Sequence, residues 1–379
     1  MELATFSHDQ SAGWAQRLRA DLDSPSTLVL AFGATELVDR PAALDDLRAA
    51  YPRSVLVGCS TAGEIHGAQV LDNSLAVAVA RFEHTRLAYA HAVVEGPDGS
   101  RAAGEAIARS LAAPDLRSVL VLSDGLHVNG TALVEGLNAA LPAGVVVTGG
   151  LAGDGDRFQR TWAIDRGVAR ANVVTAVGFY GDHVRVGHGS KGGWDIFGPE
   201  RLVTRSAGNV LYELDGRPAL ELYKSYLGER AAGLPATGLL FPLSLRSGEA
   251  GDERRLVRTI LAVDEAAQSL TFAGDVPTGW RVQLMRANFD RLVEGAGSAA
   301  ATAALKGGEG PVLSVAISCV GRRLVLGERT EEETEATLEA LPAGARQVGF
   351  YSYGELSPFA AGRCDLHNQT MTLTTLWES

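Results

Sequence analysis

The sequence of 379 residues contains few cysteines and no long hydrophobic run. Its three cysteines (Cys59, Cys319 and Cys364) are widely spaced and form no CxxC pair, which is typical of free thiols in a reducing cytoplasm. No stretch approaches the roughly 18 uninterrupted apolar residues that a membrane-spanning helix needs. The N-terminal segment has neither a basic start nor an apolar core, so we expect no signal peptide. These absences predict a cytoplasmic protein with free thiols.

Positive charge is also scarce. Asp and Glu total 45 against 34 for Lys and Arg, and the resulting net charge of −11 gives no indication of a phosphate-binding surface. Nucleic acid is therefore a poor candidate partner. The composition, 46% hydrophobic and 21% charged, is that of an ordinary soluble globular protein. The chain length favours two or three domains, each able to bury its own core.

One short pattern occurs four times along the chain. In each copy an apolar strand runs into a loop that closes with a glycine followed by an acid. The copies read VLVGCSTAGE at 55–64, VVVTGGLAGD at 145–154, FPLSLRSGE at 241–249 and QVGFYSYGE at 347–355. A segment with helical character precedes each copy, for example residues 131–141 before the second. A supersecondary unit that recurs in this way predicts tandem duplication of a compact α/β unit.

The strands that follow each copy define the expected fold class. A polar residue opens the next strand at a matching place in all four copies: Asn73, Asn172, Arg258 and Asn368. Because neighbouring strands follow closely in sequence, many must pair as antiparallel hairpins, which excludes a purely parallel sheet. We predict an α/β fold with mixed parallel and antiparallel sheets covered by helices. It should form two related domains, residues 1–208 and 209–379, with two duplicated units in each.

Several longer segments carry a family resemblance. GCSTAGEIHG in the first copy, together with GFYSYGELSPF and LHNQTMTLTTL near the C-terminus, resembles the FIST family of bacterial sensory proteins. The middle segments VTRSAGNVLYELDGRPALELYKSYLG, LLFPLSL and DVPTGWRVQLM are similar to the C-terminal FIST domain. The resemblance extends from Ser26 to Trp377, and its C-terminal motif is the most distinctive part.

The resemblance implies a sensor rather than an enzyme. FIST proteins are regarded as intracellular ligand sensors that work beside histidine kinases, cyclic-di-GMP enzymes or chemoreceptors. Amino acids and related small metabolites are the ligands suggested for the family, and one subgroup binds haem and responds to nitric oxide. No output domain follows the last expected strand, so we expect the signal to leave through a separate partner protein.

Candidate ligand-binding residues stand at the strand ends. Carboxylates there can bind an amine of a ligand, or they can accept backbone N–H bonds and fix a tight turn, and the fourfold recurrence favours this structural role for some copies. The variable residues between strand and acid are the best candidates for ligand contacts, because loops held by rigid strands carry specificity. The full candidate set is Cys59, Ser60, Thr61, Glu64, Ser123, Asp124, Asp154, Arg258, Ser352, Tyr353, Glu355 and Asn368.

Other chemistry has weaker support in the sequence. Cys59 ends an apolar strand, where a cysteine is usually an inert core residue. Ser123 and Asp124 can equally cap the following helix. The eight histidines show no metal-ligand spacing, so we expect no metal site, although a single axial histidine would suffice for a b-type haem. No spacing typical of catalytic groups occurs, so we expect no catalytic residues, and an uncharacterised enzyme is the third hypothesis.

Overall fold

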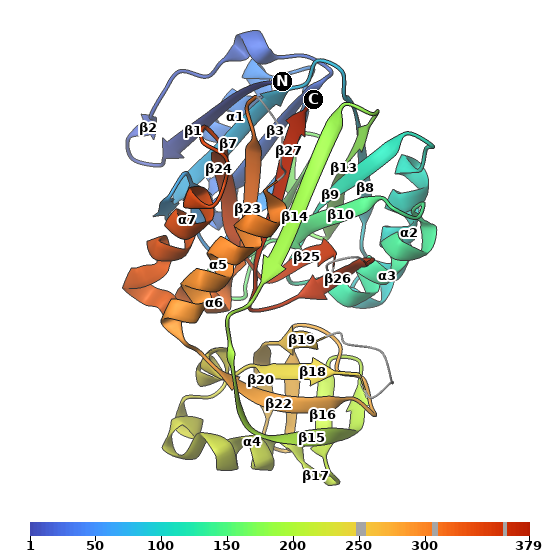
Figure 1. The fold of residues 1–379 in the computed structure, drawn as a ribbon, viewed down its shortest axis with the longest axis vertical. Helices are drawn as coiled ribbons and strands as arrows, with labels where there is room; N and C mark the ends of the chain where they lie inside the picture. The colour runs from blue at the N-terminus through green and yellow to red at the C-terminus, as the bar shows by residue number, and fades with distance from the viewer. Residues whose placement is uncertain (248–254, 305–309, 359–361) are drawn as a thin grey trace.

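The chain folds into two bodies of unequal size (Figure 1). The computed structural model describes residues 1–247, 255–304, 310–358 and 362–379. The small body takes its strands from residues 195–286, and the main body takes its strands from both sides of that segment. The mixed α/β fold class predicted from the sequence is confirmed, because parallel and antiparallel pairs occur within single sheets.

The main body contains three copies of one four-stranded unit. In each unit the first strand pairs antiparallel with the second, and the second pairs antiparallel with the third. The third strand pairs parallel with the fourth. Unit A consists of β1 (Glu2–Asp9), β7 (Ser74–Arg81), β3 (Thr27–Gly33) and β4 (Val55–Ser60). Unit B consists of β8 (Arg86–Val93), β13 (Val173–Tyr180), β9 (Leu116–Ser123) and β10 (Val146–Leu151). Unit C consists of β14 (Val184–Lys191), β27 (Met371–Glu378), β23 (Leu313–Cys319) and β24 (Arg346–Ser352).

Helices connect the parallel strands of each unit. These are α1 (Ala42–Ala50) in unit A, α3 (Gly130–Ala140) in unit B, and α6 (Val320–Leu326) with α7 (Thr330–Glu339) in unit C. Helix α2 (Ser100–Leu111) packs on α3, and α5 (Phe289–Ala303) packs on α7. Asparagine side chains cap the N-termini of α3 and α5. Asn129 accepts a hydrogen bond from the N–H of Ala132, and Asn288 accepts one from the N–H of Arg291.

A cyclic exchange of hairpins joins the three units. The hairpin β5 (Glu64–His66) and β6 (Gln69–Leu71) follows β4 in the chain but pairs with β24 of unit C. The hairpin β25 (Gly354–Pro358) and β26 (Cys364–His367) follows β24 but pairs with β10 of unit B. The hairpin β11 (Ala163–Asp165) and β12 (Val168–Arg170) follows β10 but pairs with β4 of unit A. Each unit therefore extends the sheet of another, and the cycle closes.

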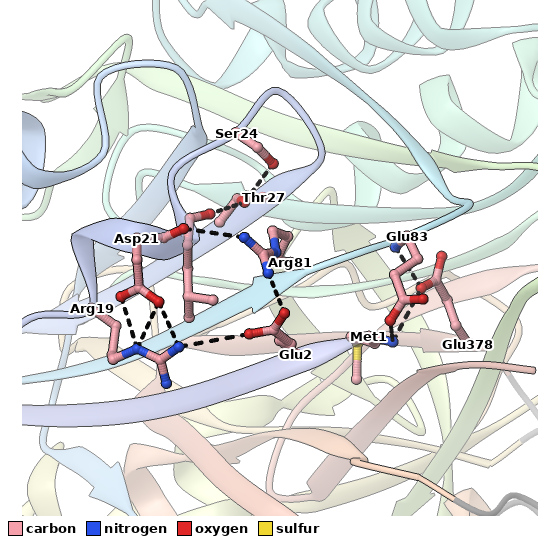
Figure 2. Close-up of polar contacts among 10 residues, drawn as sticks. Met1, Glu2, Arg19, Asp21, Ser24, Thr27, Arg81, Glu83 and Glu378 are labelled. Atoms are coloured by element: carbon pink, nitrogen blue, oxygen red, sulfur yellow. Dashed lines mark hydrogen bonds and ion pairs between the residues drawn. The ribbon is translucent and has the colours of Figure 1, made fainter.

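Core packing and the chain ends also tie the units together. The rings of Phe32 in unit A and Phe350 in unit C lie 4.7 Å apart in a shared buried cluster. Figure 2 shows the amino group of Met1 between two carboxylates, 3.0 Å from Glu83 and 3.5 Å from Glu378. Glu378 also accepts three backbone N–H groups, which lower its pKa to about 2 despite partial burial. These contacts connect the start of β1 in unit A to the end of β27 in unit C.

The small body departs from the sequence prediction. Its sheet contains β15 (Asp195–Ala207), β16 (Val210–Leu214), β17 (Arg217–Pro218), β18 (Leu243–Arg246), β19 (Arg255–Arg258), β20 (Ile260–Asp264), β21 (Ser269–Phe272) and β22 (Arg281–Arg286). Helix α4 (Ala219–Leu227) packs beside it. The third copy of the loop pattern was expected to repeat the duplicated unit, but among the described strands β18 pairs antiparallel with β19 and β22 and has no parallel neighbour. That expectation was wrong, because an apolar run such as residues 241–245 predicts a strand but does not show whether the strand pairs in parallel or antiparallel. Glu249, the acid of this copy, lies outside the described residues.

Two further predictions from the sequence concern the residues that open the strands and the limits of the two domains. Arg258 ends β19 instead of opening a strand. In unit C the residue with positive φ before the last strand is Gln369 (φ 61°), which corresponds to Asn73 (φ 53°) and Asn172 (φ 58°), so the match to Asn368 was one residue early. The domain ranges 1–208 and 209–379 remain a prediction, and strands from both sides of residue 208 pair in the sheets of the main body.

Glycine occupies an equivalent position in all three parallel pairs. A Cβ atom built on Gly58, Gly149 or Gly349 would lie 1.8, 1.8 or 1.7 Å from a carbonyl oxygen of the neighbouring strand. That oxygen belongs to the residue directly opposite in each register. Since the obstructing atom is backbone in a buried sheet, it cannot move aside, and only glycine fits.

Replacement of Gly349 by alanine should therefore lower the free energy of unfolding by about 3 kcal/mol or more, because the new methyl overpacks a rigid sheet. Urea unfolding followed by circular dichroism measures the change. The control is Gly297→Ala in α5, where the nearest atom lies 3.4 Å from the new Cβ and the helix gains up to about 1 kcal/mol. Equal stability of both variants would contradict the close-approach argument.

Candidate functional site

Loops from the three units meet at one place, which we call the three-loop junction. It comprises residues 60–64, 151–155 and 351–355. The N–H of Ala62 donates to the carbonyl of Tyr351 at 2.8 Å, and that of Gly153 donates to Ser60 at 3.0 Å. The N–H of Tyr353 donates to Leu151 at 3.2 Å, so each loop is bonded to another. The hairpin exchange thereby gathers most of the sequence-predicted candidates.

Two of the recurring acids are held in the same way. Glu64 accepts from the N–H and hydroxyl of Ser74 at 3.1 and 2.6 Å, and from the hydroxyl of Thr61. Glu355 accepts from the N–H and hydroxyl of Thr370 at 3.2 and 2.9 Å, and from the hydroxyl of Ser352 at 2.7 Å. Burial raises the pKa of Glu64 to about 7 and that of Glu355 to about 8, although these hydrogen bonds oppose the shift.

The acids of unit B fix backbone turns. Asp154 accepts the N–H groups of Phe158, Gln159 and Arg160 at 2.8–2.9 Å, and the hydroxyl of Tyr353. Asp124 accepts three backbone N–H groups in the same manner, including that of Asn172 at 2.9 Å. Hydrogen bonds of this kind fit the structural role predicted for some of the recurring acids, which is to fix a tight turn by accepting backbone N–H groups. A role for any of these acids in ligand contact remains a prediction.

Only part of the candidate set lines a cavity described below. Thr61, Glu64, Tyr353 and Arg258 do so. The others are buried and line none of these cavities: Cys59, Ser60, Ser123, Asp124, Asp154, Ser352, Glu355 and Asn368. Burial raises the pKa of the Cys59 thiol well above its ordinary value, which disfavours a nucleophilic thiolate. Neither amide atom of Asn368 has a hydrogen-bond partner within the described ranges.

A cavity of about 430 Å³ opens beside the three-loop junction, and we call it the junction cavity. All three units contribute to its lining, which includes Thr35, Glu36, Thr61, Glu64, Asp72, Asp156, Arg157 and Arg323. Arg323 donates to both carboxylate oxygens of Asp72 at 2.9 and 2.6 Å, and Arg157 pairs with Glu36. The cavity wall therefore carries several charged side chains, four of which form these two ion pairs.

A second cavity of about 420 Å³ lies between the two bodies, and we call it the interbody cleft. The main body contributes Thr131, Val134, Glu135, Asn138, Arg363, Cys364 and Asp365, and the small body contributes Leu256, Arg258, Asp275, Pro277 and Trp280. The amide of Asn129 in the main body donates to Asp275 of the small body at 3.3 Å. A neighbouring cavity of about 230 Å³ contains Tyr353, whose ring stacks on Phe158 at 4.5 Å.

Arg258 is the unusual residue of the interbody cleft. Its side chain is 1% exposed, and it donates to the backbone carbonyls of Asp275, Val257 and Leu366 at 3.0–3.2 Å. It forms no ion pair with a carboxylate of the described residues. Burial lowers the pKa of this guanidinium, while the nearby acids Asp365 and Asp275 act against the shift. A buried charge is normally paired, so this guanidinium has unused capacity to bind an anionic group.

The sequence reasoning missed several residues of these cavities. Asp275 and Trp280 lie in DVPTGWRVQLM, a segment that carries the family resemblance but in which no spacing marks single residues as ligand contacts. Arg157 and Arg323 come from a loop and a helix of other units, and no local pattern connects them with Glu64. Within the described ranges, no group of three or more His, Cys, Asp or Glu side chains is arranged to hold a metal ion.

Comparisons with known proteins match nearly the whole chain. A model of the FIST N domain matches residues 27–217, and a model of the FIST C domain matches residues 219–358. An uncharacterized protein of Mycobacterium tuberculosis, found in two strains, is 29% identical over 341 residues, which is 86% of each chain. Among the described helices, none has both the length and the apolar character needed to cross a membrane.

The buried acids predict an unusual pH dependence of stability. A carboxyl whose pKa rises from 4.5 to about 8 on folding binds its proton more tightly in the folded state. Its stabilising contribution is complete below pH 4.5 and is lost as the pH rises towards 8, so the free energy of unfolding should fall by a few kcal/mol over that interval. Denaturant titrations of Glu355→Gln should show a flatter curve, because the amide does not titrate.

The matched control is Glu378→Gln. The pKa of Glu378 is lowered to about 2, so its contribution is present above pH 4.5 and lost only as the pH falls towards 2. This variant should be less stable at neutral pH but keep the decline between pH 4.5 and 8. An unchanged slope in Glu355→Gln would show that Glu355 titrates normally.

Proposed function

This chain belongs to the FIST family, whose domains are associated with sensory signal transduction and small-ligand binding, and we propose that it senses a small metabolite held in the interbody cleft. The observation that carries the proposal is the buried Arg258 guanidinium at the boundary between the two bodies, which forms no ion pair with any carboxylate in the described part of the chain. A carboxylate on the ligand would supply the missing counterion through a charge-assisted hydrogen bond.

The rest of the cleft fits an amino acid or a related metabolite. Asp275 and Asp365 each accept a hydrogen bond at one carboxylate oxygen, from the amide of Asn129 and from the N–H of Leu366, and the second oxygen of each can accept from an ammonium group. Trp280 offers an apolar surface for a side chain. A volume of about 420 Å³ lies within the range of small-molecule sites.

The position of the cleft supplies a route for signalling. A ligand that contacts both bodies can shift their arrangement only if it binds the two arrangements with different affinity. We propose that a separate histidine kinase, cyclic-di-GMP enzyme or chemoreceptor reads that shift in the cytoplasm. Family membership supports a sensor rather than an enzyme.

Haem binding is the second candidate function. His188 lines a cavity of about 410 Å³ together with Leu141, Pro142, Val147 and Pro358. Burial lowers the pKa of this imidazole, which favours the neutral form that coordinates iron. Arg363 lines the same cavity and could pair with a propionate. Haem bound here would supply a site for a diatomic gas such as nitric oxide.

The metabolite proposal predicts that amino acids or related metabolites raise the melting temperature of the protein and bind in isothermal calorimetry. Arg258→Gln should weaken binding by about tenfold or more, because the amide cannot form the charge-assisted bond. The control is Arg255→Gln, since Arg255 is exposed on the same strand and does not line the cleft. Circular dichroism of the free variants checks that both are folded. Equal affinity of the folded Arg258→Gln variant would refute the proposed site.

The haem candidate predicts a Soret band in protein purified with haem supplied. His188→Ala should abolish that band, whereas His183→Ala on the preceding turn should leave it unchanged. A protein without a Soret band after incubation with haem would eliminate this candidate.

A further inference from the structure

We propose that the cavity of about 230 Å³ beside the interbody cleft is a second binding site, which takes an uncharged small molecule with an aromatic ring. We call it the aromatic cavity. Both bodies line it, and no described residue lines both this cavity and either the interbody cleft or the junction cavity. The inference goes beyond the proposed metabolite site and does not depend on Arg258.

The wall of the aromatic cavity is mostly apolar and carries no charge. Among the described residues that line it, none is an Asp, Glu, Lys, Arg or His. The amide of Asn129 already donates to Asp275 at 3.3 Å, and that of Asn209 donates to the carbonyl of Phe272 at 2.8 Å. A charged ligand group would lose its water here without gaining a counterion, which costs free energy. The wall therefore favours a neutral ligand.

Phe158 offers an open aromatic surface to such a ligand. Its ring stacks on that of Tyr353, with centroids 4.5 Å apart and planes inclined by 14°. Tyr353 is the inner ring at 8% exposed, whereas Phe158 is 38% exposed and lines the cavity. A further ring can pack on the exposed part of Phe158 in an offset stack. Leu261 of the small body, 37% exposed, lines the same cavity and adds open apolar area.

A segment found only in unit B carries Phe158 to this place. In units A and C the recurring acid belongs to the hairpin itself, because β5 begins at Glu64 and β25 begins at Gly354. In unit B the hairpin strand β11 begins at Ala163, and residues 155–162 lie between it and Asp154. Strand pairing in units A and C needs no such segment. Its presence in unit B is a departure from the shared scaffold, at the boundary between the bodies.

The backbone of Phe158 is held in an uncommon conformation. Its φ is 52°, in the left-handed region that bulky side chains rarely adopt. The N–H of Phe158 donates to Asp154 at 2.9 Å and to the hydroxyl of Tyr353 at 3.3 Å. Strain of this kind persists only where surrounding contacts fix it, and it is common at ligand-binding sites. The ring is thus held in place before a ligand binds, which reduces the entropy lost on binding.

The volume of the cavity sets the size of the ligand. A closed apolar cavity of about 150 Å³ is enough to hold benzene. The aromatic cavity, at about 230 Å³, therefore has room for one ring or two fused rings. Because Phe158 belongs to the main body and Leu261 to the small body, a bound ring system would contact both.

The test uses 2-naphthol as the probe, with its saturated analogue decahydro-2-naphthol and the anion 2-naphthoate as controls. Isothermal calorimetry at pH 7 should show binding of 2-naphthol. The saturated analogue should bind about threefold to tenfold more weakly, because it cannot stack on Phe158. The anion should bind about tenfold more weakly or less, because the wall offers no counterion.

Two variants of Phe158 locate the site. Phe158→Ala should weaken 2-naphthol binding by about tenfold or more, because the stacking surface is lost. Phe158→Leu keeps an apolar side chain, so it should remove the preference for 2-naphthol over decahydro-2-naphthol. The matched control is Phe289→Ala, since Phe289 is also exposed, at 45%, but does not line the cavity. Circular dichroism checks that each free variant is folded.

Four results would overturn the proposal. The first is the absence of 2-naphthol binding up to about 1 mM, where a specific site should be detected. The second is equal binding of 2-naphthol and decahydro-2-naphthol. The third is a folded Phe158→Ala variant that binds 2-naphthol like the unmodified protein. The fourth is a dimer in analytical ultracentrifugation that dissociates in Phe158→Ala, because a second copy of the chain would then cover the ring.

One comparison separates this site from the proposed metabolite site. Arg258→Gln should bind 2-naphthol like the unmodified protein, and Phe158→Ala should keep its affinity for amino acids. Failure of amino acids to bind, with 2-naphthol binding retained, would contradict the metabolite proposal alone. Loss of 2-naphthol binding in the folded Arg258→Gln variant would contradict a separate aromatic site.

Discussion

The exchange of hairpins among three four-stranded units is the constraint on which the rest of the main body depends. No unit has a complete sheet on its own, since β5, β11 and β25 each extend the sheet of another unit. The hydrogen bonds of these strands are backbone bonds, and buried backbone groups must be satisfied. The three units are consequently obliged to assemble together, and their loops must converge where the hairpins cross.

The two cavities have different origins, and only the junction cavity follows from this arrangement. At the crossing point the recurring acids hold the turns, and the equivalent groups Glu64 and Glu355 share one bonding pattern. Unit A leaves Glu64 at the edge of a hollow, whereas Glu355 in unit C is completely enclosed. The interbody cleft has another origin, because its polar groups come from two bodies, which are bonded to each other there by Asn129 with Asp275 and by Arg258 with Leu366. The units therefore share one scaffold, and the cavities lie where the units differ from one another or where the two bodies meet.

Local sequence signals were enough to predict the mixed sheets and the turn-forming acids. Apolar runs mark the strands, and a glycine before an acid marks the turns. The partner of a hairpin strand is not a local property, so pairing of residues 64–66 with 348–350 could not be read from spacing. The same limit applies to the sites. Thr61 faces a cavity and the adjacent Ser60 does not, while Arg323 reaches Gly63 from a distant helix.

The hairpin exchange also sets the order in which the chain can fold during synthesis. Strands β25 and β26, near residue 360, complete the sheet that unit B begins with β8, and β24 pairs with β5. Long-range pairings of this kind form slowly, and a growing chain exposes unpaired strand edges until they close. The described strands of the small body, by contrast, pair only with one another within 195–286. On the ribosome the small body can finish first, while the earlier strands of the main body wait for the last residues to emerge.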